Sequence, residues 1–170
     1  VSYQELHENK QKLDRRYREA NLLSGVIRRI TQNQSTESLT TQTLSEIHDT
    51  LGFDRVIYMS HDPEKATLKI AELVGFEEKT RTLLAKYQLD LNTATLSDLH
   101  LGNVFKNRTS LLVPMTTDYY DSLSPEGKKM IDVAGSRSFL ACTVASERKA
   151  YGLLLVDYCQ SPKIVSKDDL

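Results

Sequence analysis

The chain has 170 residues, a formal net charge of −1 from 22 basic and 23 acidic residues, and two cysteines. This length suits one domain with an appended segment, and the balanced charge, without a block of like charge, argues against a nucleic-acid or membrane-surface partner. No apolar run is long enough to cross a bilayer and the cysteines form no CxxC pair, so we expect a cytoplasmic segment without a disulfide framework.

The first 34 residues are predicted to form a signalling helix. Residues 3–31 contain no proline, and apolar or small residues recur at alternating three- and four-residue steps. Charged side chains fill most positions between them, so the helix has only a narrow stripe to bury. A homodimeric coiled coil and an amphipathic helix packed on its own domain both fit this pattern, and we favour the dimer. Its interface would contain Leu6, Leu13, Tyr17, Ala20 and Ile27.

The remaining residues, 35–170, are predicted to form one domain that begins with a helix and a strand hairpin. The helix spans residues 37–51, begins at a cap on Ser35 or Thr36 and ends at Gly52. Strands are predicted over residues 53–60 and 67–74, because both are rich in β-branched and aromatic residues. Asp62-Pro63-Glu64-Lys65 supplies the turn between them, and His61, just before Asp62, is predicted to lie in the same turn. The helix would bury Leu39, Leu44, Ile47 and Leu51.

The middle of the domain is predicted to be mostly helical. A helix over residues 77–87 would turn Leu83 and Leu84 inward, and a short helix is expected around residues 96–105. A strand follows over 110–115, and then a polar loop over 116–122. Ser124 and Pro125 supply the cap and first turn of a helix that continues to Ala134.

A second hairpin is predicted to close the domain. Its apolar strands span residues 139–145 and 151–158, and the charged residues 146–149 join them. Residues 166–170 have the pattern of a helix start without its body. We therefore expect an excised segment of a larger protein, truncated at the start of a C-terminal helix.

This order of elements resembles the GAF domain, and the similarity covers residues 35–170. LGFDRVIY at 51–58 is similar to the first helix-to-strand junction of the family. VFKNRT at 104–109, continuing to Pro114, is similar to the segment where a short helix leads into a central strand. GSRSFLA at 135–141 and YGLLLVD at 151–157 resemble the closing hairpin of the family. SKDDL at 166–170 looks like the start of its final helix.

The resemblance implies an α/β fold in which an antiparallel sheet carries helices on both faces, with a small-molecule pocket between the sheet and its middle helices. Family members bind cyclic nucleotides, bilins, haem or other small metabolites, or nothing known, and they commonly signal through helices in a dimer. The Asn-Lys-Phe-Asp-Glu set of the cyclic-nucleotide class does not assemble here in order, and no bilin-attachment cysteine is evident. The cofactor therefore remains unnamed, and Cys142, within an apolar strand, is interpreted as a buried inert thiol.

Eight residues are candidates for ligand binding. His100 lies where a pocket would be capped and would contact a ligand oxygen or a haem iron, or instead hydrogen-bond to the backbone at a helix end. The loop that holds Asp118 would present hydroxyls and carboxylates, or be a solvated loop. Ser136 and Arg137 would hold an anion, or cap a helix end. The full set is His100, Asn103, Phe105, Asp118, Tyr119, Tyr120, Ser136 and Arg137.

Catalytic and metal chemistry find no support in the sequence. No two histidines have the i, i+4 spacing of ligands on one helical face, and no nucleophile elbow or phosphate-binding loop is present. The favoured function is therefore a regulatory domain that senses a small molecule and passes pocket occupancy to its flanking helices, as in a histidine kinase or nucleotide cyclase. The alternative is a ligand-free dimerisation and spacing module whose own side chains fill the pocket.

Overall fold

The computed structural model describes residues 4, 7, 10, 11, 37–93 and 100–159. The predicted dimer interface and the predicted C-terminal helix start lie outside these residues, as does the predicted cap of the second helix. None of the described helices has the length and apolar character needed to cross a membrane.

The domain is built on a six-stranded antiparallel sheet with the strand order β3-β2-β1-β6-β5-β4. The first and last long strands therefore lie side by side at its centre. The strands are β1 (Arg55–Asp62), β2 (Thr67–Val74), β3 (Gln88–Asp90), β4 (Ser110–Pro114), β5 (Ser138–Ala145) and β6 (Ala150–Asp157).

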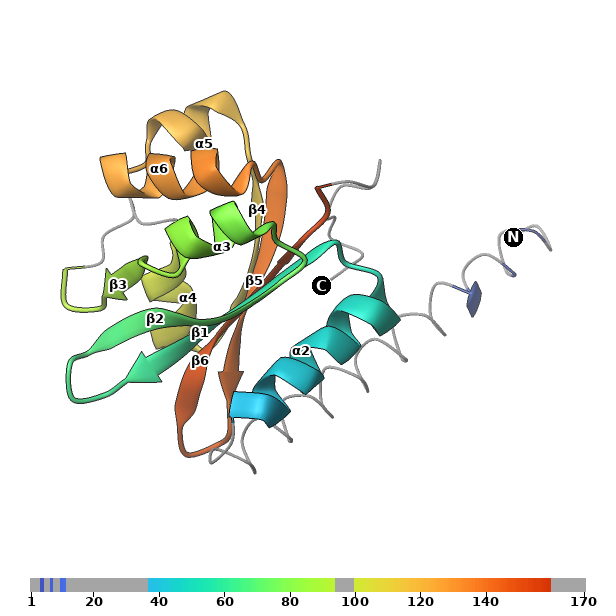
Figure 1. Ribbon diagram of the computed structural model, residues 1–170, viewed down its shortest axis with the longest axis horizontal. Helices are drawn as coiled ribbons and strands as arrows, with labels where there is room; N and C mark the ends of the chain where they lie inside the picture. The colour runs from blue at the N-terminus through green and yellow to red at the C-terminus, as the bar shows by residue number, and fades with distance from the viewer. Residues whose placement is uncertain (1–3, 5–6, 8–9, 12–36, 94–99, 160–170) are drawn as a thin grey trace.

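Helices cover both faces of this sheet, as predicted from the sequence. Helix α2 (Glu37–Leu51) lies on one face, and the helices between β2 and β5 lie on the other (Figure 1). These helices are α3 (Glu78–Leu84), α4 (Leu101–Asn107), α5 (Thr117–Asp121) and α6 (Pro125–Ala134). The predicted α/β fold class is confirmed.

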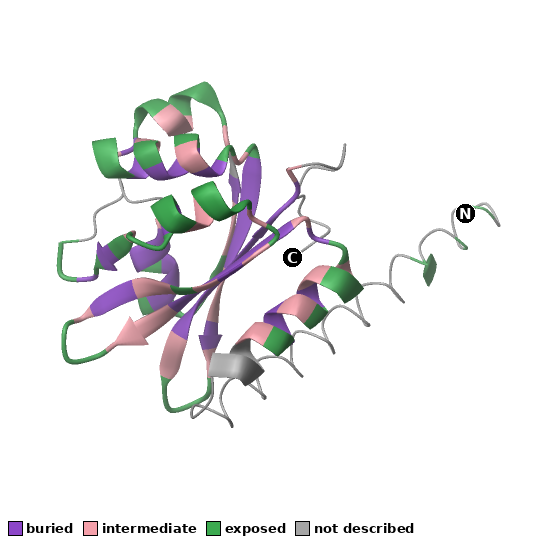
Figure 2. Ribbon diagram, in the orientation of Figure 1, coloured by how far each residue is buried: buried purple, intermediate pink, exposed green. Residues whose placement is uncertain are grey.

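The two-residue period of the strands divides the core into two layers. In β1, Ile57 and Met59 face the layer under α3, α4 and α6, whereas Val56 and Tyr58 face the layer under α2. Both faces of the central strands are therefore apolar, which explains the continuous apolar run in β1. Figure 2 shows buried residues along these strands and along the inward faces of the helices.

Local signals placed several elements correctly. Helix α2 has the predicted bounds, and Gly52 ends it at a φ of +72°, with its N–H donating to the carbonyl of His48 at 3.1 Å. Its Leu44 and Ile47 are buried, as predicted. The hydroxyl of Ser124 accepts a hydrogen bond from the N–H of Gly127 at 3.1 Å, which confirms the predicted cap of α6.

Four predictions were wrong. Leu83 points outward and is 46% exposed, because α3 buries only Leu84 from this pair. The segment predicted as a polar loop contains α5, whose first turn is capped by the Thr116 hydroxyl, which accepts from the N–H of Tyr119 at 3.2 Å. His61 belongs to β1 rather than to the turn, and β3, which has only three residues, was not predicted.

Candidate functional site

A buried polar cluster joins three segments that are far apart in the sequence. Arg55 is the first residue of β1 and Asp157 the last of β6, and the two residues pair across the sheet. Helix α6 ends beside them at Ala134, after which Gly135 turns the chain at a φ of +64° and brings Ser136 to the same place. We call Arg55, Asp157, Ser136 and the Ala134 carbonyl the Arg55 cluster.

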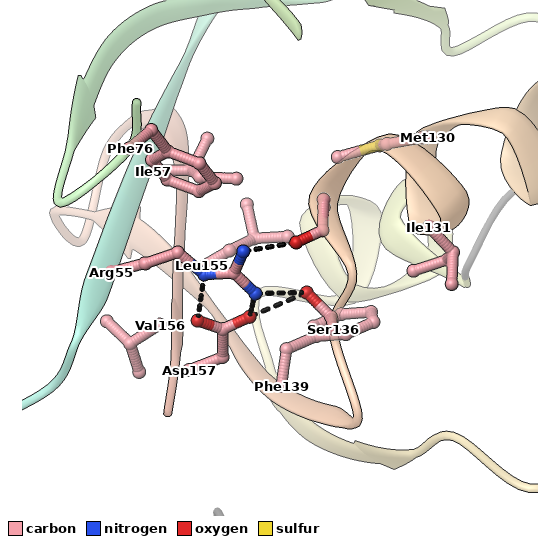
Figure 3. A pocket seen from close by; sticks show the side chains of 11 residues that line it. Arg55, Ile57, Phe76, Met130, Ile131, Ser136, Phe139, Leu155, Val156 and Asp157 are labelled. Atoms are coloured by element: carbon pink, nitrogen blue, oxygen red, sulfur yellow. Dashed lines mark hydrogen bonds and ion pairs between the residues drawn. The ribbon is translucent and has the colours of Figure 1, made fainter. Parts of the chain in front are cut away.

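The geometry of the Arg55 cluster is that of a two-point guanidinium–carboxylate pair (Figure 3). Nε of Arg55 donates to Oδ1 of Asp157 at 2.7 Å, and Nη2 donates to Oδ2. The same Nη2 donates to the Ser136 hydroxyl at 3.0 Å, and that hydroxyl donates to Oδ2 of Asp157 at 2.6 Å. Nη1 donates to the carbonyl of Ala134, so the guanidinium also caps the C-terminus of α6.

The surroundings of Arg55 keep it charged although it is buried. Arg55 is 7% exposed and Asp157 is 5% exposed. Burial by itself lowers the pKa of Arg55, but the hydrogen bond and negative charge of Asp157 outweigh that effect and leave the pKa raised. The ring of Phe76 lies 4.9 Å from the guanidinium carbon and adds a cation–π contact.

A small cavity adjoins the Arg55 cluster, between the sheet and α6. Its volume is about 20 Å³, which is room for about one water molecule. Apolar side chains form most of its wall, and they include Met130 and Ile131 of α6, which are labelled in Figure 3. A ligand larger than water would therefore have to displace side chains here. The lining residues other than the cluster are Ile57, Phe76, Met130, Ile131, Phe139, Leu155 and Val156.

Only one of the eight predicted ligand residues, Ser136, belongs to the Arg55 cluster. Its neighbour Arg137 is exposed and does not line the cavity. The guanidinium in this cluster is that of Arg55 instead. The hydroxyl of Ser136 bridges Arg55 and Asp157 beside the end of α6, and its predicted contact with an anionic ligand stays a prediction.

Two other predicted residues, His100 and Tyr119, meet at a second place. Their ring centroids are 5.6 Å apart. His100 precedes α4 at a φ of 57°, and its side chain makes no capping hydrogen bond to a described residue. The buried hydroxyl of Tyr119 has no hydrogen-bond partner among the residues that the structure describes, and burial raises its pKa to about 12. The backbone of His100 is therefore strained, and the hydroxyl of Tyr119 lacks a described partner. Both features occur at functional sites, but each also occurs at positions without a function.

The remaining predicted residues do not converge on either place. Asn103 and Asp118 are exposed, and Phe105 is part of the core, 4.7 Å from the ring of His61. Tyr120 donates its hydroxyl to Asp132 at 2.8 Å on the outside of the domain. No group of three or more His, Cys, Asp or Glu residues suited to a metal ion occurs in the described part of the chain.

Arg55 and Asp157, the two central residues of the cluster, were not predicted from the sequence. They are 102 positions apart, so no local spacing links them. The available signal was a charge at the end of each of two apolar strands, Arg55 before Val56 and Asp157 after Val156. A charge in such a position is seldom buried unless it is paired, so two opposite charges of this kind indicate a buried pair.

Comparison with known proteins supports the architecture. No protein-family model and no curated protein sequence matches the chain. Among solved structures, residues 122 to 287 of a methyl-accepting chemotaxis protein match with 22% identity and a TM-score of 0.62, over 85% of each chain. The phycoerythrobilin-bound GAF domain of a cyanobacterial phytochrome matches with 18% identity and a TM-score of 0.59, over 89% of this chain and 86% of that one. The GAF domain of an Acinetobacter phosphoenolpyruvate-protein phosphotransferase matches with 17% identity and a TM-score of 0.53, over 85% and 81%.

Proposed function

We propose, on the premise that this chain has the GAF fold, that it is a non-catalytic sensory or regulatory domain of a cytoplasmic signalling protein. In this proposal a small molecule bound beside the Arg55 cluster alters the segments that enter and leave the domain. The fold is shared with domains of a chemotaxis protein, a phytochrome and a phosphotransferase, and these relatives motivate a signalling role. Because fold alone does not establish function, the proposal depends on the geometry of the Arg55 cluster.

One observation carries the proposal: the Arg55 cluster joins the start of β1, which follows shortly after α2, to the end of β6. Arg55 follows shortly after the end of α2, and Asp157 stands at the end of the last strand. The N–H of Asp54 also donates to the carbonyl of Asp157 at 3.0 Å. A ligand that takes one donor of Arg55 therefore acts directly on the connection between the start of β1 and the ends of β6 and α6.

The coupling needs a difference in affinity. A ligand shifts the flanking segments only if it binds one arrangement of them better than the other, and such coupling is typically about 1–3 kcal/mol. Because the polar groups of the Arg55 cluster already satisfy one another, a ligand must offer an equivalent acceptor to compete. A carboxylate, phosphate or carbonyl oxygen meets this requirement.

The rival proposal is a ligand-free dimerisation and spacing module, and the small cavity favours it. Room for about one water leaves no space for a metabolite unless Phe76 or Met130 moves. Both proposals share the homodimer through Leu6, Leu13, Tyr17, Ala20 and Ile27. Disulfide crosslinking of Leu13→Cys or Ala20→Cys tests that dimer in a Cys159→Ser background, and absence of crosslinked chains would contradict it.

Native mass spectrometry of the purified chain separates the two proposals. The sensor proposal expects a reproducible mass excess that is lost on denaturation and is reduced in Ser136→Ala, which removes one polar contact of the site. Ser110→Ala is the matched control, because Ser110 is exposed on β4. Hydrogen exchange in α2 should then differ between loaded and stripped protein. A bare chain with unchanged α2 exchange would favour the spacing module.

A further inference from the structure

The outer layer of helices contains a groove that the sensing proposal does not use. The groove lies between α3 and α6 and has a volume of about 360 Å³. Its apolar lining includes the buried Leu84 and Met130 and the half-buried Tyr87 and Val133. Leu83 also lines it and is 46% exposed, which makes it the one exposed large hydrophobic side chain in the part of the chain that the structure describes. We call this feature the α3–α6 groove.

The walls of the α3–α6 groove are helical, which determines the shape of segment that fits. Glu126, Lys129, Met130 and Val133 recur at three- and four-residue steps, so they form one stripe along α6. Helix α3 lies beside α6 on the same face of the sheet (Figure 1). A furrow between two neighbouring helices accommodates the apolar face of a third helix, whereas an extended peptide needs a free sheet edge.

The charges around the α3–α6 groove favour an acidic occupant. Lys86 and Lys129 are exposed, and neither forms an ion pair with any described residue. Glu126 is the single acidic residue among those that line the groove, so the rim has a surplus of positive charge. Carboxylates on both sides of an apolar stripe would pair with the two lysines while the stripe covers Leu83.

We propose that the α3–α6 groove docks an amphipathic helix of a partner protein, with an apolar stripe flanked by Asp or Glu. The central apolar contact is with Leu83, Tyr87 and Val133, and the rim contacts are with Lys86 and Lys129. Such a small groove suits a weak, reversible interaction rather than a permanent one. The groove shares Met130 with the lining of the cavity beside the Arg55 cluster but none of the polar contacts of that cluster, so docking does not require the sensing proposal.

A displayed peptide library tests this proposal directly, because selection requires only the groove and a defined class of helix. The probe is a randomised library of amphipathic helical peptides, selected on the immobilised whole chain. The enriched peptides should carry apolar residues at three- and four-residue steps with acidic residues beside them. Their affinity should fall at least about tenfold in Leu83→Asp, which places a charge at the centre of the contact, and severalfold in Lys129→Glu. Lys106→Glu on α4 is the control, because Lys106 is equally exposed but lies outside the groove.

The charge contact has a second, independent readout. Reversing the acidic residues of an enriched peptide to lysine should restore binding to Lys129→Glu and weaken binding to the unchanged chain. Leu83 is already exposed, so its substitution should leave the urea unfolding curve unchanged, which separates docking from folding. The proposal is overturned if no helical peptide is enriched, or if the enriched peptides bind Leu83→Asp as tightly as the unchanged chain. Peptides that are enriched without acidic residues would overturn the assigned partner chemistry.

Discussion

Replacing Asp157 with asparagine should destabilise the domain strongly, because it leaves a buried guanidinium without its counter-charge. Asp157 accepts from two nitrogens of Arg55 and from the hydroxyl of Ser136, and both charged residues are less than one-tenth exposed. Hydrogen bonds to charged groups contribute about 1.5–3 kcal/mol each, and removal of one partner from a buried pair costs about 3–5 kcal/mol. We expect Asp157→Asn to lower the free energy of unfolding by about 3–5 kcal/mol.

Urea denaturation followed by circular dichroism measures this loss. The matched control is Asp121→Asn, because Asp121 is exposed on α5, and its free energy of unfolding should lie within about 0.5 kcal/mol of that of the unchanged chain. The double variant Arg55→Met/Asp157→Leu removes both charges and should recover most of the stability lost in the single variant. A loss below about 1 kcal/mol in Asp157→Asn would refute the reasoning. The single variants Arg55→Met and Asp157→Leu complete the cycle, and a double variant whose loss of stability equals the sum of their two losses would refute the reasoning as well.

Two further predictions concern Cys142, which is half-buried rather than fully buried as the sequence predicted, and two glycines with a positive φ. Burial raises the pKa of Cys142 to about 12, so the folded chain holds this proton while the unfolded chain loses it above about pH 9. The contribution of this group to the free energy of unfolding should be constant below about pH 9 and then fall with rising pH, by at most about 4 kcal/mol. Cys142→Ala should reduce the fall seen in urea titrations across this range. The remaining fall should come from Cys159, whose pKa burial also raises, and, from near pH 10, from Tyr58 and Tyr119, whose pKa values are raised to about 12. Gly75→Ala should lower the midpoint of thermal unfolding more than Gly52→Ala does. Both glycines have a positive φ, but a Cβ at Gly75 would lie 2.0 Å from the carbonyl oxygen of Asp54, whereas a Cβ at Gly52 would face open space. Equal losses would contradict this.

The order of elements was predictable because its signals are local. Helix α2 has an apolar stripe and a glycine end signal, and the strands beside it have β-branched runs, so each could be identified from a short window. Helix α5 was missed because a five-residue helix has no room for an apolar period. Strand β3 was missed for the same reason, since three residues cannot show alternation.

The sites were harder to predict because they depend on tertiary placement. Leu83 and Leu84 are adjacent and both fit an inward stripe, and only the docking of α3 beside α6 decides which of them is buried. The ion pair of the Arg55 cluster depends on the pairing of β1 with β6, which no spacing in the sequence reveals. The contact between His100 and Tyr119 arises in the same way, from two separate helices packed on one face.

The position of the buried ion pair bears on the choice between a sensor and a spacer. A module that only holds helices apart gains little from a buried guanidinium–carboxylate pair, because apolar side chains of similar volume are often equally stabilising at such a position. What the pair adds is a specific geometry, and here that geometry fixes the ends of β1, β6 and α6 relative to one another. A ligand that competes for one donor of Arg55 loosens this connection between β1, β6 and α6. A helix bound in the α3–α6 groove contacts none of the polar groups of this connection and shares only Met130 with the cavity beside it. Asp157→Asn and Leu83→Asp, neither of which alters Met130 itself, therefore perturb the two surfaces separately.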